Sequence, residues 1–486
     1  MTQSQVEPTT VAEEAGSGSR IPSGRSWLDR YFHISDRNST VAREVRGGLT
    51  TFMAMAYILL LNPLILSGAD ISGHRLGQAP LVTATALGAA VTTLVMGCVG
   101  KVPLALAAGL SVSGVMSTQV VPNMTWPQAM GMCVIYGAVI VLLVVSGLRE
   151  MIMNAIPLPL KHAITIGIGM FIALIGLVHA GFVGVGSADA PVTLGAGGHL
   201  TGWPVLIFAV TLLLIFALQA RKVPGAILIG IMAGTVIAVV VQAVAGLGAK
   251  AWGYAVPELP RKVVSLPDFS LLGHVEFGGW GHIGGMTVGI IVFTLVLAGF
   301  FDAMATIIGV GTEAGLADAR GRMPGLSKAL LIDGAGGMVG GFVGGSGQTV
   351  FVESATGVGE GARTGLASVV TGLLFAAGLF FTPLAQIVPS QVAAAALVVV
   401  GSMMMGNAKH VNWSDRSVAI PVFLTVALMP FTYSITAGVG AGVIAYTVIK
   451  TAQGKWREPG AFMWALSVVF TVYFALHPIQ GWLGVH

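Results

Sequence analysis

Residues 344–361 read GGSGQTVFVESATGVGEG. This stretch opens with several glycines, continues through the β-prone run TVFV and then reaches Glu353, all within an apolar region. A regular membrane helix does not have this pattern. Irregular backbone at membrane depth is tolerated only where it is buried in protein or lines a cavity. The stretch therefore predicts a broken membrane segment beside a binding site.

A second segment of the same kind lies in the first half of the chain. Residues 104–121 read LALAAGLSVSGVMSTQVV, with Ser111 and Ser113 in the first half of the segment. Each broken segment begins roughly 60 residues after the start of its half, counted from Gly48 and Gly285. Gly-interrupted segments at matching positions of two halves indicate a transporter site built on broken helices. Glycines that merely allow close packing are the alternative.

The composition places the whole chain in a membrane. Of its 486 residues 55% are hydrophobic and only 9% are charged, with a mean hydropathy of +0.86. Soluble domains carry about 25% charged residues, so a soluble enzyme, a secreted disulfide scaffold and a disordered chain are excluded. The net charge is only +4, which does not suggest nucleic-acid binding, and two cysteines form no framework.

Apolar runs long enough to cross a bilayer predict about fourteen spans. They lie near 49–68, 81–99, 104–121, 128–147, 159–181, 203–219, 225–247, 285–312, 327–344, 346–361, 364–382, 390–406, 418–433 and 435–452. With the N-terminus inside, all but four of the 24 Lys and Arg residues fall on the cytoplasmic side, as the positive-inside rule requires. Seven spans per half is an odd number, so the two halves must be inverted repeats.

The ends of the chain differ from this unit. Residues 1–26 are polar and rich in Ser, Gly and Pro, and we expect a disordered cytoplasmic tail. Residues 453–486 form a C-terminal segment in which the apolar stretch 461–480 either spans the membrane or lies on its surface.

Three acidic residues lie well inside apolar spans, where charge is costly and usually functional. For Glu353 the alternative to a site is a helix cap, and for Asp302 it is a structural hydrogen bond. Asp333 is as well explained by anchoring the neighbouring broken segment. Burial disfavours a charged carboxyl group, so these residues are also candidate proton carriers. Phe351 is a candidate to stack on a planar ligand, or else a core residue.

The sequence contains no motif for phosphate binding, metal binding or nucleophilic catalysis. Two four-residue glycine ladders, Gly336–Gly340–Gly344 and Gly337–Gly341–Gly345, predict helix packing and resemble no phosphate-binding loop. No HExxH motif or close histidine pair indicates a metal, and no nucleophile motif is present. We expect no enzyme activity, no cofactor and no metal.

Several strings resemble the AzgA-like branch of the nucleobase–cation symporters. They include GGLTTFMAMAYILLLNPLIL, GVGTEAGLADARGRMPGLSKALLIDGAGG and VFVESATGVGEGARTGLASVVTGLLF, and the resemblance runs from about Trp27 to Lys450. It implies an all-α membrane fold similar to the uracil transporter, with fourteen spans in two inverted repeats and short strands in spans 3 and 10. It further implies a core of residues 27–147 and 285–382 and a gate of residues 159–247 and 390–452.

The resemblance also implies a function and a site. Members import adenine, guanine or hypoxanthine, usually with protons, through the plasma membrane by alternating access. Glu353 matches the glutamate that binds the base, Asp302 the acidic residue of the eighth span and Asp333 the aspartate of the ninth. The chain departs from the family pattern around the third and tenth spans, where Ser111, Ser113 and Gln348 add polar groups.

Several alternatives stay open at this point. Glu353, Asp302, Phe351, Ser111, Ser113 and Gln348 form the expected substrate site, and Glu353, Asp302 and Asp333 the expected proton-coupling residues. In one alternative the cation transported with the substrate is sodium and not a proton. In others the same fold carries another nucleobase or an anion, or the chain is a sensor that does not transport. A homodimer is an open option, since relatives of this fold often dimerise.

Overall fold

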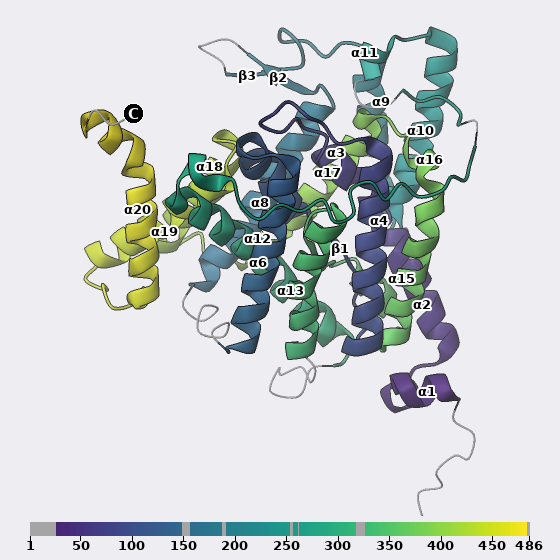
Figure 1. Ribbon diagram of the computed structural model, residues 1–486, viewed down its shortest axis with the longest axis horizontal. Helices are drawn as coiled ribbons and strands as arrows, with labels where there is room; N and C mark the ends of the chain where they lie inside the picture. The colour runs from purple at the N-terminus through teal and green to yellow at the C-terminus, as the bar shows by residue number, and fades with distance from the viewer. Residues whose placement is uncertain are drawn as a thin grey trace, which may run out of the picture.

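The structure, a computed structural model, is a bundle of membrane-length helices with one helix standing at its edge (Figure 1). It describes residues 26–147, 156–186, 191–252, 256–260, 262–316 and 326–483. The predicted tail 1–26 lies almost wholly outside this part of the chain.

Two groups of helices build the bundle. The first helix group comprises α2 (Val41–Met55), α3 (Ile58–Ile65), α4 (Gln78–Val95), α5 (Leu110–Val115), α6 (Trp126–Val145), α12 (Gly285–Glu313), α13 (Leu326–Val343), α14 (Ser354–Gly359), α15 (Gly365–Gly378) and α16 (Thr382–Ala385). The second helix group comprises α8 (Leu158–His179), α9 (Trp203–Ala220), α10 (Ala226–Ala245), α17 (Ser390–Met404), α18 (Arg416–Phe431) and α19 (Ile435–Ala452). Within the first, α13 packs on α6 and α15 on α2 and α4; within the second, α17 and α18 pack on α8.

Smaller elements complete the described chain: α1 (Trp27–Phe32), α11 (Ala249–Trp252), α20 (Gly460–Leu483), and the strands β1 (Leu106–Ala108), β2 (Val183–Val185), β3 (Val192–Leu194) and β4 (Gln348–Val350). In the described part of the chain, nine helices are long and apolar enough to cross a membrane, and shorter apolar helices add to them. The protein is therefore a multi-pass membrane protein, and the figure of fourteen spans stays a prediction.

The two broken segments meet each other in the middle of the first helix group. β1 and β4 pair antiparallel, with Leu106 opposite Val350 and Ala108 opposite Gln348. Each strand continues into a short helix, β1 into α5 and β4 into α14. Neither segment could leave its backbone unpaired in the membrane, so each satisfies the other.

Side chains from neighbouring helices complete the hydrogen bonding along the outer edges of this two-stranded ribbon. On the β1 edge, the Thr93 hydroxyl accepts from the Leu106 N–H at 2.9 Å and donates to the Leu106 carbonyl at 2.8 Å. On the β4 edge, Asp333 Oδ1 accepts from the Val350 N–H at 3.1 Å and from the Thr349 hydroxyl at 3.0 Å. The two edges are thus closed in equivalent ways by α4 and α13.

A buried amide ties the ribbon to the first spans. Asn62 on α3 donates to the Thr85 hydroxyl at 2.8 Å and to the Gly345 carbonyl at 2.9 Å. Its Oδ1 accepts from the Ser113 hydroxyl at 2.7 Å, and Ser113 in turn lies 3.2 Å from the Ser346 hydroxyl. This single side chain therefore connects four different segments. A buried polar group needs such partners because leaving it unpaired costs free energy.

The glycine ladders pack α13 closely on both sides, as the sequence predicts. A Cβ at Gly337 would lie 2.9 Å from the Gly137 Cα on α6, and one at Gly341 only 2.7 Å from the Met130 carbonyl oxygen. The other ladder faces the ribbon segment: a Cβ at Gly340 would lie 1.8 Å from the Ser346 carbonyl oxygen. The small residues thus hold α13 between α6 and β4.

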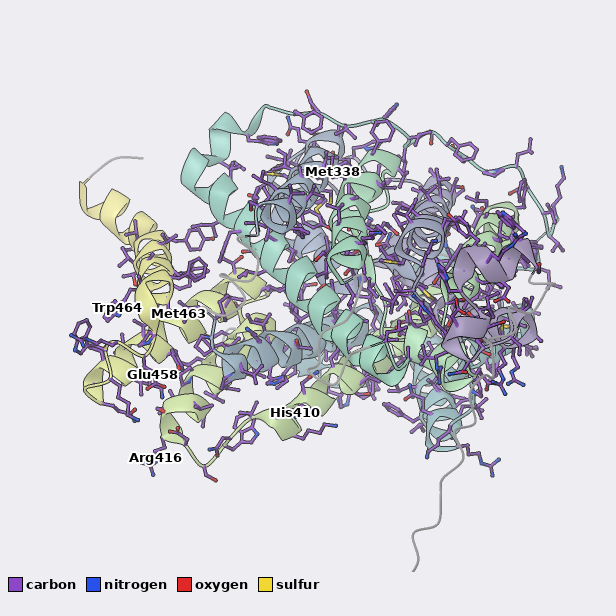
Figure 2. The ribbon with its side chains drawn as sticks, turned by 90° about the horizontal axis from the view of Figure 1, so that it is seen from below. Met338, His410, Arg416, Glu458, Met463 and Trp464 are labelled. Atoms are coloured by element: carbon purple, nitrogen blue, oxygen red, sulfur yellow. The ribbon has the colours of Figure 1, made fainter. Side chains whose placement is uncertain are left out.

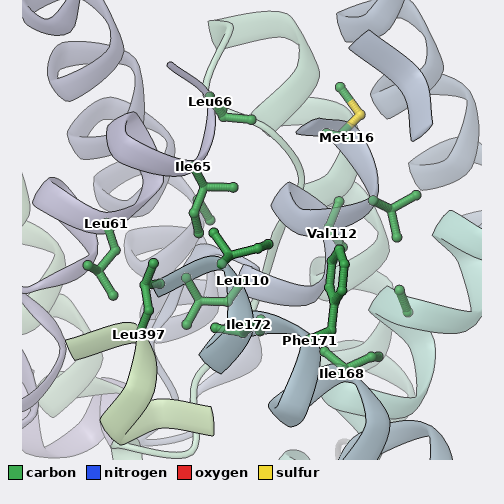
Figure 3. Packing of buried hydrophobic residues seen from close by; sticks show 14 of the residues in the cluster. Leu61, Ile65, Leu66, Leu110, Val112, Met116, Ile168, Phe171, Ile172 and Leu397 are labelled. Carbon is green, nitrogen blue, oxygen red and sulfur yellow. The ribbon is translucent and has the colours of Figure 1, made fainter. Parts of the chain in front are cut away.

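An apolar contact joins the two helix groups (Figure 3). The first group contributes Leu61, Ile65, Leu110 and Val112, and the second contributes Ile168, Phe171, Ile172 and Leu397. Within this part of the interface there is no ion pair among the described residues. A contact made by apolar side chains has few directional constraints.

Segments predicted to be cytoplasmic lie together at one end of the bundle, near α1 (Figure 1). The Arg37 guanidinium donates to the Lys101 carbonyl at 2.6 Å and to the Arg363 carbonyl at 3.0 Å. Glu44 accepts from the backbone N–H groups of Arg363 and Thr364 at 2.8 and 3.2 Å. Three of the segments predicted to be cytoplasmic, those of Arg37, Lys101 and Arg363, therefore lie in contact with one another.

The C-terminal apolar stretch, whose location the sequence leaves open, forms α20. This helix stands at the edge of the bundle and carries Met463 and Trp464 (Figure 2). It packs on α19, where a Cβ at Gly440 would meet the rings of Phe470 and Phe474 at 2.7 and 2.8 Å.

Replacing Gly340 by Ala tests the packing of α13 on the ribbon segment. The new methyl group would collide with the Ser346 carbonyl, so we expect the melting temperature in detergent to fall by several degrees. Gly289→Ala on α12 is the matched control, because a Cβ there has nothing within 4 Å. Equal melting temperatures for the two variants would contradict this account.

Candidate functional site

Glu353 lies where β4 turns into α14. It occupies the N-cap position of that helix, yet its side chain makes no capping hydrogen bond. Instead its carboxylate accepts a hydrogen bond from the hydroxyl of Tyr57 on the first span. The side chain is only 8% exposed. Its side chain therefore does not cap α14, and it places a buried carboxylate between spans.

A small cavity of about 70 Å³ surrounds this carboxylate. Three segments of the first helix group and one helix of the second line it: Tyr57, Leu110, Ser111, Val350, Phe351, Val352, Glu353, Val400 and Met404. Most of the wall is apolar, and Tyr57, Ser111 and Glu353 supply its polar side-chain groups. A buried, mostly apolar pocket with a few polar groups is the usual form of a small-molecule site.

Two other predicted site residues lie in the same cavity. Phe351 is buried in its wall, and its N–H donates to the Ala105 carbonyl at 3.0 Å. Ser111 on α5 also lines it, with its hydroxyl 3.5 Å from the Ala298 carbonyl of α12. The structure therefore brings Glu353, Phe351 and Ser111 together.

Ser113 and Gln348 lie elsewhere. Ser113 is fully buried and bonds to Asn62 and Ser346, so it belongs to the network that holds the ribbon. The Gln348 amide donates to the Ser346 carbonyl at 3.0 Å, and it lies against Gly88 of α4. Neither lines the cavity around Glu353.

The other two acidic residues have different positions. Asp333 is buried on α13 and closes the outer edge of β4 with two hydrogen bonds, which is the anchoring alternative that the sequence left open. Asp302 falls on α12, which packs against α14, but its side chain is outside the described part of the structure. Among the described residues, no three His, Cys, Asp or Glu side chains form a group that could hold a metal ion.

Sequence reasoning missed six lining residues, which are Tyr57, Leu110, Val350, Val352, Val400 and Met404. Tyr57 sits in the string AMAYILLLNP, where a tyrosine five residues before the polar Asn62 marks the first span as more than a lipid-facing helix. Val400 and Met404 lie in an Ala-, Val- and Met-rich span with no polar signal, so only the fold could place them on the cavity.

Solved structures with similar folds are membrane transporters. The transmembrane domain of the cyanobacterial bicarbonate transporter BicA matches with a TM-score of 0.60 at 17% identity, covering 83% of this chain and 97% of that chain. Murine Slc26a9, an anion transporter in its inward-facing state, matches with a TM-score of 0.61 at 13% identity, covering 92% of this chain and 77% of that one. At these identities the likeness concerns the fold, which is the one that the sequence predicts.

Relatives at higher identity are nucleobase permeases. The adenine permease AdeP of Escherichia coli is 35% identical over 93% of this chain and 97% of its own length. The guanine/hypoxanthine permease PbuG of Bacillus subtilis is 35% identical over 92% of this chain and 99% of its own length. These relatives are transporters and not enzymes, and they confirm the resemblance drawn from the sequence. Because the Permease family model Xan_ur_permease also matches residues 42–477, this chain belongs to that family of permeases.

Proposed function

We propose that the protein imports a purine nucleobase together with a cation, most simply a proton, across the plasma membrane. The observation that carries this proposal is the buried Glu353 carboxylate in a cavity between the two helix groups. The nucleobase permeases that resemble the chain over nearly its whole length support the choice of substrate. The N-terminus would lie in the cytoplasm, with the basic end of the bundle, and a homodimer is compatible with this arrangement.

The side chains that line the cavity suit one edge and one face of a planar base. The Glu353 carboxylate would accept hydrogen bonds from ring N–H groups, which is the strong, charge-assisted kind. Phe351 would stack on the ring face, and Ser111 would add a hydroxyl that can donate or accept. A proton on Glu353 would neutralise the site, and Asp302 would contribute to coupling from α12.

Transport by alternating access follows from the way the cavity is walled. We assign the first helix group as the core that carries substrate and the second as the gate, with Val400 and Met404 of α17 closing the cavity. A space of about 70 Å³ holds about two water molecules, so a base needs a wider cavity. Movement of the core along the apolar contact with α8 and α17 would open it to one side of the membrane at a time.

Uptake of labelled adenine, guanine, hypoxanthine, xanthine and uracil in cells lacking their own permeases tests the function. We expect one purine to accumulate and a protonophore to abolish its accumulation. Glu353→Gln should lower uptake by about 10- to 100-fold, because hydrogen bonds to a charged group contribute about 1.5–3 kcal/mol.

The matched control for that experiment is Glu360→Gln. Glu360 lies seven positions further on, partly exposed and paired with Arg46 at 2.9 Å, so its replacement should leave uptake unchanged. Exclusion of all five bases by a protein that is folded in the membrane would refute the nucleobase assignment. Uptake that survives the protonophore but needs sodium would replace the proton by sodium.

Asp333 is expected to act on the fold and not on proton coupling. Asp333→Asn keeps an oxygen that can accept from the Val350 N–H, so uptake should stay within about twofold of wild type and remain sensitive to the protonophore. Asp333→Ala leaves that N–H unpaired and should lower the melting temperature and the amount of folded protein. Loss of protonophore sensitivity in Asp333→Asn would instead make Asp333 a proton carrier.

A further inference from the structure

Tyr57 occupies an irregular point of the first span. α2 ends at Met55 and α3 begins at Ile58, and between them the chain forms a tight turn. Here the Leu59 N–H donates to the Ala56 carbonyl at 3.1 Å and the Leu60 N–H to the Tyr57 carbonyl at 3.0 Å. The turn lies beside the cavity, so a side chain from the middle of the first span reaches it.

The Tyr57 side chain is 1% exposed and crosses from the first span to the tenth, where its hydroxyl donates to Glu353 Oε1. Both residues line the same cavity. The contact therefore connects the substrate-binding carboxylate to a helix distant from it in sequence.

A phenol differs from a cationic partner in what it does to a carboxylate. It fixes the side chain and favours the ionised form through a hydrogen bond, but it adds no positive charge. A lysine or arginine at this point would compete with the N–H groups of a bound base and would oppose protonation of the carboxylate. A neutral donor permits both the binding of a base and the protonation of the carboxylate.

The charged groups described on the neighbouring helices α2 and α13 include several that have partners of their own. On α2, Glu44 accepts from two backbone N–H groups and Arg46 pairs with Glu360. On α13, Asp333 holds the β4 edge. Asp302 on α12 remains unchanged in the comparison below, so it contributes equally to every variant.

We propose that Tyr57 is a positioning residue that orients the Glu353 carboxylate and sets the pH range over which it exchanges its proton. This inference rests on the proposed function, in which Glu353 takes up a proton at one stage of the import cycle. Uptake then falls at high pH, where the carboxylate stays ionised. The Tyr57 hydroxyl stabilises that ionised form, so removing it should let Glu353 hold its proton to higher pH.

The test is the pH profile of purine uptake by wild type and Tyr57→Phe. In Tyr57→Phe the alkaline limb of the profile, where uptake falls as the pH rises, should move to higher pH by about one unit. This shift is equivalent to about tenfold tighter proton binding, because one hydrogen bond to the ionised carboxylate is lost. Tyr136→Phe is the control: Tyr136 is also a buried tyrosine of the first helix group, but it does not line the cavity, so its profile should match wild type.

A second, nearly isosteric change at position 57 tests the inference independently of how well Tyr57→Phe folds. A ring-fluorinated tyrosine at position 57 has a more acidic hydroxyl and donates more strongly, so its alkaline limb should move down. Uptake that is lowered equally at every pH, with the limb in place, would overturn the inference and leave the proposed function intact. Absence of purine uptake by wild type would overturn the proposed function itself, and the inference with it.

Discussion

Two segments of this protein stop being helical inside the membrane, and the hydrogen bonds of their exposed backbone constrain the rest of the first helix group. The β1–β4 pairing satisfies one edge of each strand. Thr93 and Asp333 close the outer edges, and Asn62 ties the adjoining turn to the first span. With no water in the bilayer core to substitute for these partners, each is required for the irregular backbone to exist. The glycines of α13 serve the same purpose, because only they let that helix approach the ribbon closely enough.

The position of the candidate site follows from the pairing of β1 with β4. Because β1 and β4 run antiparallel, α5 and α14 begin at opposite ends of the ribbon, and the cavity beside it receives Ser111 from one half of the chain and Glu353 from the other. The opposite wall belongs to α17, in the second helix group, and it is apolar. The polar side chains that line the cavity thus all come from the first helix group, whereas much of the contact with the second group is apolar and a hydrogen bond between Thr294 and Thr436 crosses it elsewhere.

Much of this arrangement could be predicted from the sequence, and the rest could not for definite reasons. The glycines and the β-prone run before Glu353 interrupt an apolar span, and that local pattern is sufficient to locate β4 and the carboxylate, whereas the strand in the other broken segment was implied by the family resemblance. The glycine ladders have a period that shows directly in the sequence. Ser113 and Gln348 were expected to bind substrate because they are polar residues near the breaks, but polarity alone does not distinguish a lining group from one that braces the ribbon. Tyr57, Val400 and Met404 reach the cavity only through contacts between distant segments, which no local pattern reports.

The ribbon also bears on how the chain is made. Strand β1 leaves the ribosome about 240 residues before β4, a delay of roughly 10–50 s at ordinary rates of synthesis. During that interval the segment of β1 and α5 has entered the membrane region without the partner that completes its hydrogen bonding. It must wait in contact with its neighbouring helices or with the insertion machinery, and the first half cannot mature as an independent unit. Although the halves read as repeats, the transporter can therefore complete its fold only once the second broken segment has emerged.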